Sequence, residues 1–384
     1  MIVVTSNWAI GDGTLAPAVE PSLGGLVAAV HRAVLRAGVR ADGSYRPVDR
    51  LDVVLAGDTF DWLLSAEWLA NHKPWHASAA ARETLVRIAG GSTRLGWPVL
   101  RSLIHWARHG VNVPATRGGS WCVAVPTRVT ILVGDRDREV ERVCGNRWHS
   151  VSIGRCWDDG RVSIRHGHEA DPVCSSCAAD GSHQLDRPPT LAESVTVELL
   201  ARFAAAIAPE GRSFMRRLAA AGVMEVPGVI RAWRASSAAA MSQRASDAWR
   251  RSVDAWWRTA QRCVPAVEAE FDAVGALAGW FRAAVEEDAT TCPPAGLIPP
   301  AGLIRLVCRR ARGSAGAVFG HLQGAGVPMS AVGLGSAVRA VGCRNPQGWP
   351  TWDVVAGAAV AAAVVTVQPS GVTMAGGDRV VDAA

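Results

Sequence analysis

The sequence has almost no lysine and almost no tyrosine. Lys73 and Tyr45 are the only residues of their kinds among 384, so arginine supplies all but one of the 40 basic side chains. Such a composition, with abundant alanine, is typical of a genome rich in GC codons. The formal net charge of +6 is therefore weak evidence for a polyanionic partner, and nucleic acid is not expected as one.

Long hydrophobic runs are also missing. The longest tract of small apolar residues, 356–367, is too short to cross a bilayer as a helix. The opening residues 1–5 lack the basic segment and the long apolar segment of a secretory signal. The nine cysteines have no regular spacing and are odd in number, which favours reduced thiols over a disulfide framework. We therefore expect a cytoplasmic protein with a large hydrophobic core.

Short apolar runs ending in polar residues are the main structural signal. They lie at 2–5, 51–56, 129–133, 162–164 and 317–319. Runs of this length predict buried strands, and helical patterns at 23–37 and 80–88 lie between the early ones. Alternating strands and helices predict an α/β sheet, in which functional groups gather at the carboxyl ends of the strands. The residues expected there are Asp58, Asp135, His166 and His321.

The middle of the chain has a different pattern. Residues 188–294 show helical periodicity and no strand pattern, and β-like segments return only afterwards. We interpret 188–294 as a helical insertion or cap between the two parts of an α/β core, at 1–187 and 295–384.

Arginine and tryptophan are concentrated in this predicted insertion. Ten arginines lie between Arg212 and Arg262, and Trp233, Trp249 and Trp256 are interleaved with them. One interpretation is a basic, aromatic face that binds a membrane surface or another anionic partner. The alternative is an amphipathic cap whose tryptophans pack inward and whose arginines are solvated, and the overall arginine bias favours it.

The residues at the expected strand ends occur in an ordered set. The segments are Ser6-Asn7-Trp8-Ala9, Gly57-Asp58-Thr59-Phe60-Asp61, Gly134-Asp135-Arg136-Asp137, His166-Gly167-His168 and Gly320-His321-Leu322-Gln323. In order and spacing this set resembles the calcineurin-like metallophosphoesterases, and within them the diacylglucosamine pyrophosphatase branch. The resemblance implies a four-layer α/β/β/α fold, here with a helical insertion.

The resemblance also implies which residues would hold metal ions. Members of that family bind two divalent ions that share one carboxylate, which corresponds to Asp58. The other positions of the first ion correspond to Asn7, Ala9 and Gln323. Alanine cannot ligate a metal and neutral amides are poor ligands for a transition metal, so this first site is expected to be lost.

The second metal site is expected to be retained. Its positions correspond to Asp58, Asp135, His166 and His321, all of which are competent ligands for one Mn, Fe or Zn ion. The family's catalytic histidine corresponds to Arg136, whose charge would replace part of the charge of the missing ion. Arg136 and Asp137 are the residues expected to take part in catalysis, if any remains, and Asp137 is also expected to brace its loop.

These features predict a degenerate metallophosphoesterase that binds a phosphorylated small molecule or a partner protein. Classical dinuclear catalysis is expected to be lost, because one metal and the general acid are missing together. Two alternatives stay open. The first is an active mononuclear phosphoesterase that hydrolyses a phosphomonoester, phosphodiester or pyrophosphate, and the second is a scaffold that acts through its helical insertion.

A separate zinc site is a further possibility at Cys174-Ser175-Ser176-Cys177. His168 and His183 lie near this Cys-x-x-Cys pair in the sequence. A second pair of ligands at the usual spacing is missing, so two loop thiols are the favoured interpretation.

Overall fold

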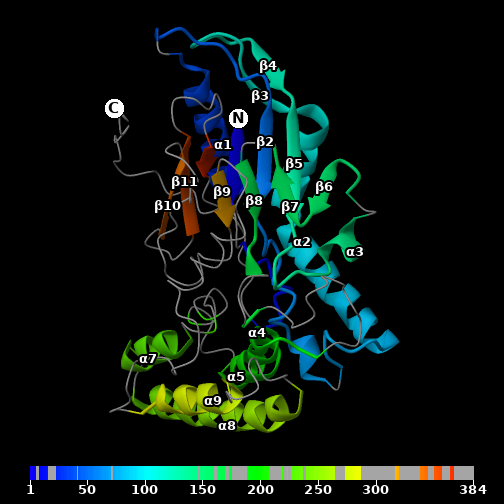
Figure 1. Cartoon of the computed structure of the whole chain (residues 1–384), viewed down its shortest axis with the longest axis vertical. Helices are drawn as coiled ribbons and strands as arrows, with labels where there is room; N and C mark the ends of the chain where they lie inside the picture. Colours follow the sequence, from blue (N-terminus) through cyan, green and yellow to red (C-terminus); the bar gives the residue numbers. More distant parts are fainter. Residues whose placement is uncertain are drawn as a thin grey trace.

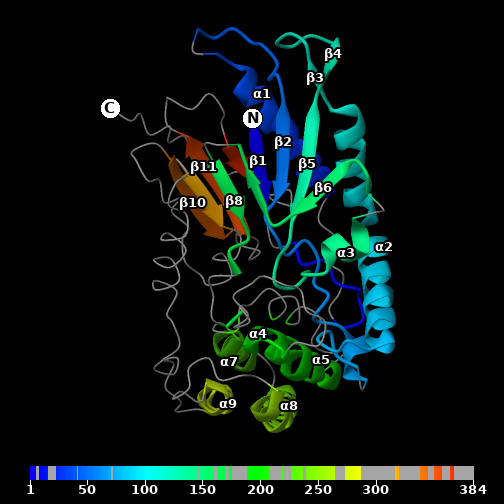
Figure 2. The same cartoon turned by 45° about the vertical axis from the view of Figure 1, so that its right-hand side comes forward.

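A computed structural model describes the chain in segments, and within them the protein has a mixed α/β structure. Figures 1 and 2 draw the whole chain from two directions. The described residues are 1–5, 8–15, 23–40, 42–70, 72–145, 148–159, 162–168, 173–174, 188–207, 214, 218, 223, 226–236, 239–263, 273–286, 316–319, 338–344, 350–356 and 364–366.

The largest sheet combines strands from both ends of the described chain. Strands β12, β1, β2, β5 and β6 pair in parallel, and β10 and β11 extend the sheet in antiparallel fashion beyond β12. Across the sheet the order is β10 (Val338–Arg344), β11 (Pro350–Ala356), β12 (Val364–Thr366), β1 (Ile2–Thr5), β2 (Leu51–Leu55), β5 (Thr127–Leu132) and β6 (Val151–Gly154). All five residues of β2 are buried, as expected for a central parallel strand.

Two smaller sheets accompany it. Strands β7 (Cys156–Asp158), β8 (Val162–Arg165) and β9 (Gly316–Phe319) form a three-stranded sheet, in which β8 and β9 pair in parallel. Strands β3 (Val111–Pro114) and β4 (Cys122–Val125) form a hairpin. The α/β class is thus confirmed for the described residues.

The crossover helices of the large sheet differ in how well the sequence predicts them. Helix α1 (Leu23–Gly38) connects β1 to β2 and agrees with the predicted segment. Helix α2 (Ala79–His109) runs 21 residues beyond the predicted end at residue 88. Its length was underestimated because Gly90, Gly91 and Pro98 are poor helix formers.

Tertiary packing explains why α2 continues through these residues. The helix lies along β5 and β6 (Figure 2). Along its length it buries a row of side chains in the hydrophobic core, against the sheet and against the segment that contains Ile10, and this burial outweighs the weak local propensity. The row comprises Leu85, Ile88, Ala89, Ser92, Gly96, Val99, Leu100, Leu103 and Trp106.

Between β8 and β9 every described element is helical. The elements are α4 (Leu191–Ser194), the π-helical turn η3 (Val195–Leu200), α5 (Ala201–Ile207), α7 (Val226–Ser236), α8 (Ala239–Cys263) and α9 (Ala273–Ala283). We call them the helical region. It lies at the end of the molecule toward which β1 and β2 point (Figures 1 and 2). The domain boundaries expected at 187/188 and 294/295 stay a prediction, because the described residues do not test them.

The helical region and the large sheet each have a hydrophobic core. In the helical region Trp249 and Trp256 are completely buried, and Phe203 and Phe281 contact Trp249 edge-on. These two tryptophans therefore contribute to packing and do not form a surface patch. Among the described helices, none combines the length and the apolar character needed to cross a bilayer.

Candidate metal centre

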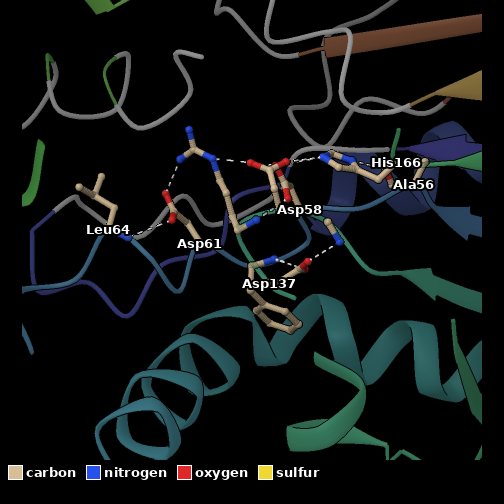
Figure 3. Close-up of polar contacts among 10 residues, drawn as sticks. Ala56, Asp58, Asp61, Leu64, Asp137 and His166 are labelled. Atoms are coloured by element: carbon tan, nitrogen blue, oxygen red, sulfur yellow. Dashed lines mark hydrogen bonds and ion pairs between the residues drawn. The ribbon is translucent and has the colours of Figure 1, made fainter. Parts of the chain in front are cut away.

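Three strand ends bring their polar residues to one place. Asp58 follows β2, Asp135 follows β5, and His166 follows β8 of the smaller sheet. The carboxyl ends of the seven-stranded and three-stranded sheets therefore meet at a cluster of buried charges (Figure 3). Of the residues predicted for the second metal site, the structure brings these three together.

Two glycines allow this close approach. Gly57 has a φ of +90°, and a Cβ atom at this position would lie 2.3 Å from Nδ1 of His166. A Cβ atom on Gly134 would lie 2.0 Å from Oδ1 of Asp58. Larger residues would force the loops apart, which is a physical reason for glycine before both Asp58 and Asp135.

The backbone at the site is strained. Asp58 and Ala9 have φ values of +50° and +49°, and they are the only non-glycine residues with positive φ in the described segments. The two residues are neighbours, because the N–H of Ala9 donates to the carbonyl of Asp58 over 2.9 Å. Strain of this kind costs about 1–3 kcal/mol per residue and is concentrated at functional sites.

His166 is completely buried and both its ring nitrogens are engaged. Nδ1 donates a hydrogen bond to the carbonyl oxygen of Ala56, 2.9 Å away. Nε2 lies 2.8 Å from Oδ1 of Asp135 and 3.4 Å from Oδ2 of Asp58. The backbone carbonyl thus fixes the ring so that Nε2 points at two carboxylates, which is the usual support of a metal-binding histidine.

The carboxylates stabilise a proton on this ring. Burial lowers the pKa of His166, but Asp58 and Asp135 more than compensate and raise the pKa well above its ordinary value. The proton on Nε2 therefore stands between oxygens that would otherwise attract a metal cation, and metal binding would displace it.

His168 is a candidate ligand that the sequence analysis did not assign to this centre. One ligand atom each of Asp135, His166 and His168 lie within 4.8 Å of one another, so this cluster could hold one metal ion. The rings of the two histidines are 5.3 Å apart, and Gly167 turns the chain between them with a φ of +97°. The sequence signal for His168 is the His-x-His spacing with His166, which was interpreted only as part of a zinc site with the cysteines.

Arg136 occupies the other side of the carboxylate cluster. Its Nη1 lies 2.7 Å from Oδ2 of Asp61 and its Nε lies 3.9 Å from Oδ2 of Asp58. Its backbone N–H donates to Oδ1 of Asp58 over 3.0 Å. Burial lowers the pKa of Arg136, but Asp61, Asp58 and Asp135 together raise it above its ordinary value, so the side chain stays charged.

Asp137 connects the two aspartate loops. Its Oδ1 accepts from the N–H of Gly134 over 2.8 Å, and its Oδ2 accepts from the N–H of Phe60 over 3.1 Å. Burial and the Asp58 carboxylate raise the pKa of Asp137 to about 7, although these hydrogen bonds lower it. This geometry is that of a brace, and the catalytic roles expected for Arg136 and Asp137 stay predictions.

The remaining predicted positions are only partly placed. Ala9 lies beside Asp58 and offers no side-chain donor atom. Asn7, His321 and Gln323 lie outside the described residues, as do Cys177 and His183 of the alternative zinc site. Cys174 is described and is buried.

Two buried ion pairs tie the helical region to the loops of the site. Arg138 follows the Asp135–Asp137 segment, and its Nε lies 3.7 Å from Oε1 of Glu193 in α4. Lys73 lies 3.1 Å from Oε1 of Glu198 in η3, and its ammonium donates to the carbonyl of Trp68. The helical region is thus docked against the loops that flank the candidate metal centre.

Neither the known protein families nor the curated proteins and solved structures include a match to this chain.

Proposed function

We propose that this protein is a degenerate metallophosphoesterase that binds a phosphorylated small molecule or partner protein at a single metal centre. The observation that carries the proposal is the convergence of Asp58, Asp135 and His166 at three strand ends, in the order that the resemblance implies. The two sheets would then be the inner layers of a four-layer α/β/β/α fold.

The residues of the centre fit one divalent transition-metal ion. Asp135, His166 and His168 offer a mixed carboxylate and imidazole set, and Asp58 lies within 3.4 Å of Nε2 of His166. Such a set suits Mn, Fe or Zn. When bound, the ion would supply positive charge for phosphate oxygens. Asp58 and Asp135 would hold it, and the Ala56 carbonyl would keep the ring of His166 oriented.

Other residues of the site support the loss of dinuclear catalysis. Ala9, where the resemblance expects a histidine ligand, has only a methyl side chain. Arg136, where it expects the histidine that protonates the leaving group, is held by Asp61 and cannot act as an acid near neutral pH.

Metal content of the purified protein tests this proposal. After loading with Mn²⁺ and removal of the excess, we expect about one ion per chain in the wild type. Asp135→Asn and His166→Ala should lose it, while His105→Ala, on the exposed face of α2, should keep it. Circular dichroism would establish that the variants are folded. A wild type without metal, even after reconstitution, would contradict the proposal.

The active mononuclear phosphoesterase remains a second candidate, favoured by the coherent ligand set around His166. It predicts Mn²⁺-dependent hydrolysis of bis(p-nitrophenyl) phosphate that is lost in His166→Ala and kept in His105→Ala. Metal binding without hydrolysis would leave the binding function as the better account.

A further inference from the structure

Asp58 divides the buried charges of the site into two halves. On one side its Oδ2 faces Nε2 of His166, where Asp135 completes the arrangement. On the other side the same oxygen faces Nε of Arg136, whose Nη1 contacts Asp61. Figure 3 shows Asp58 between Asp61 and His166, and the ion pairs of Arg136 with Asp61 and Asp58 lie on the Asp61 side. The half on the Asp61 side thus contains the guanidinium cation of Arg136, and the half on the His166 side contains the candidate ligands for a metal cation.

The arginine half is built to hold a cation in a fixed place. The side chain of Arg136 is only 13% exposed, and those of Asp61 and Asp58 are 3% and 9% exposed. Oδ1 of Asp61 accepts from the N–H of Leu64, and Oδ1 of Asp58 accepts from the N–H of Arg136. Each carboxylate therefore has one oxygen anchored by the backbone and the other directed at the guanidinium.

The charges of the two halves sum to −2, which one divalent ion would neutralise. The sum counts the carboxylates that form ion pairs with Arg136 or His166, so Asp58, Asp61 and Asp135 supply three negative charges and Arg136 supplies one positive charge. The buried carboxylate of Asp137 is not part of this sum, because its oxygens accept from the backbone N–H groups of Phe60 and Gly134. The remaining charge of −2 is balanced by a single divalent ion bound to a neutral His166. Buried carboxylates without such a balance would be strongly destabilising.

We infer that the guanidinium of Arg136 is a built-in cation that occupies a second cation site formed by Asp58 and Asp61. It limits the centre to one metal ion, and its removal opens a second site for a divalent ion. The inference rests on the proposed function, because it assumes that the half containing His166 and Asp135 binds the first metal ion. Arg136 is thus a positioning residue that sets the number of ions bound.

The test is the number of Mn²⁺ ions bound per chain, measured by equilibrium dialysis at saturating Mn²⁺ for folded protein. The wild type should bind one ion, and Arg136→Ala should bind two, the second more weakly. Arg136→Gln should also bind two and offers a second neutral variant if the alanine variant does not fold. Arg136→Lys keeps the charge and should bind one.

Arg138→Ala is the matched control. The side chain of Arg138 is also 13% exposed, but its ion-pair partner is Glu193 in the helical region. Removal of Arg138 should lower stability without adding a second ion. A thermal melt gives an independent reading. The melting temperature of Arg136→Ala should rise more with Mn²⁺ than that of the wild type, whereas Arg138→Ala should respond as the wild type does.

The outcomes separate this inference from the proposed function. One ion in the wild type and still only one in both neutral Arg136 variants would overturn the inference and leave the metal centre standing. No ion in the wild type and one in the neutral variants would overturn the proposed function but support the blocking role of Arg136. No ion in any of them would overturn both.

Discussion

The helical region and the strand-end site bury polar groups in different ways. In the helical region, the indole N–H of Trp249 donates to the carbonyl of Phe281 over 2.6 Å, and that of Trp256 donates to the hydroxyl of Ser194 over 3.1 Å. At the strand ends, Asp58 is instead shared between Arg136 and His166, on a backbone with positive φ. One region combines large apolar side chains with neutral hydrogen bonds between its helices, while the other concentrates charge and strain.

This difference indicates what each region contributes. A folded chain tolerates shared buried charges and strained backbone where they are useful, and offsets their cost by efficient packing elsewhere. The tryptophan-rich core of the helical region is suited to supply that stability. The strand-end site is where an ion would relieve the excess of negative charge.

The largest expected effect is on stability, in the helical region. Trp249→Ala removes a completely buried side chain that contacts Phe203 and Phe281, and should lower the free energy of unfolding by about 3–5 kcal/mol. Mn²⁺ affinity of the folded protein should stay within a few-fold of wild type. Urea denaturation and Mn²⁺ titration measure the two quantities. A large loss of Mn²⁺ affinity would mean that the two regions are not separable in this way.

A smaller effect is expected from a methyl group at the site. Gly134→Ala would place its Cβ 2.0 Å from Oδ1 and 2.3 Å from the backbone nitrogen of Asp58, so Asp58 must move. We expect a loss of about 1–3 kcal/mol in stability and roughly a tenfold or greater loss in Mn²⁺ affinity.

Gly90→Ala is the matched control for this substitution. Gly90 lies within α2, and a Cβ atom there would meet nothing within 4 Å. Alanine should therefore stabilise the helix by about 0.5–1 kcal/mol and leave Mn²⁺ affinity unchanged. If the two substitutions had the same effect, close packing against Asp58 would not be the reason for glycine at position 134.

The smallest expected effect is a pH dependence of stability in metal-free protein. Because the pKa of Asp137 is about 7 in the fold and near 3.8 ordinarily, the folded state binds more protons between these values. The free energy of unfolding should therefore fall as pH rises from about 4 to 7. Asp137→Asn lacks this titration, so between pH 5 and pH 8 the wild type should lose about 1–3 kcal/mol relative to the variant.

Urea denaturation in EDTA at the two pH values checks this prediction. Any hydrogen bond that asparagine fails to make with Phe60 or Gly134 affects both pH values equally and cancels in the comparison. Parallel pH profiles of the two proteins would show that Asp137 does not bind a proton in this range.

The sequence predicted the strand ends because short apolar runs followed by glycine and aspartate carry their own signal. Asp58, Asp135 and His166 were placed in this way, and the structure brings them together. Contacts between distant segments carry no such signal. The extension of α2 beyond residue 88 depends on packing against the sheet, and the position of His168 depends on the turn at Gly167.

The pairing of side chains from distant segments could not be predicted from the sequence either. The sequence suggested that Arg136 adds positive charge to the site, but not that Asp61 holds its guanidinium. Likewise, the spacing of Trp249 and Trp256 fitted either a surface or a core. Only the packing of α5 and α9 against α8 shows that both tryptophans are buried.

The one lysine of the chain has a practical consequence. Lys73 is mostly buried, paired with Glu198, and followed by Pro74. In the docked state its ammonium group is shielded from acylating reagents, and no other lysine side chain competes for them. The rate at which this single lysine is modified therefore reports how often η3 detaches from the loop that carries Lys73. Peptide mapping by mass spectrometry measures this rate on the unaltered sequence and distinguishes Lys73 from the α-amino group of Met1.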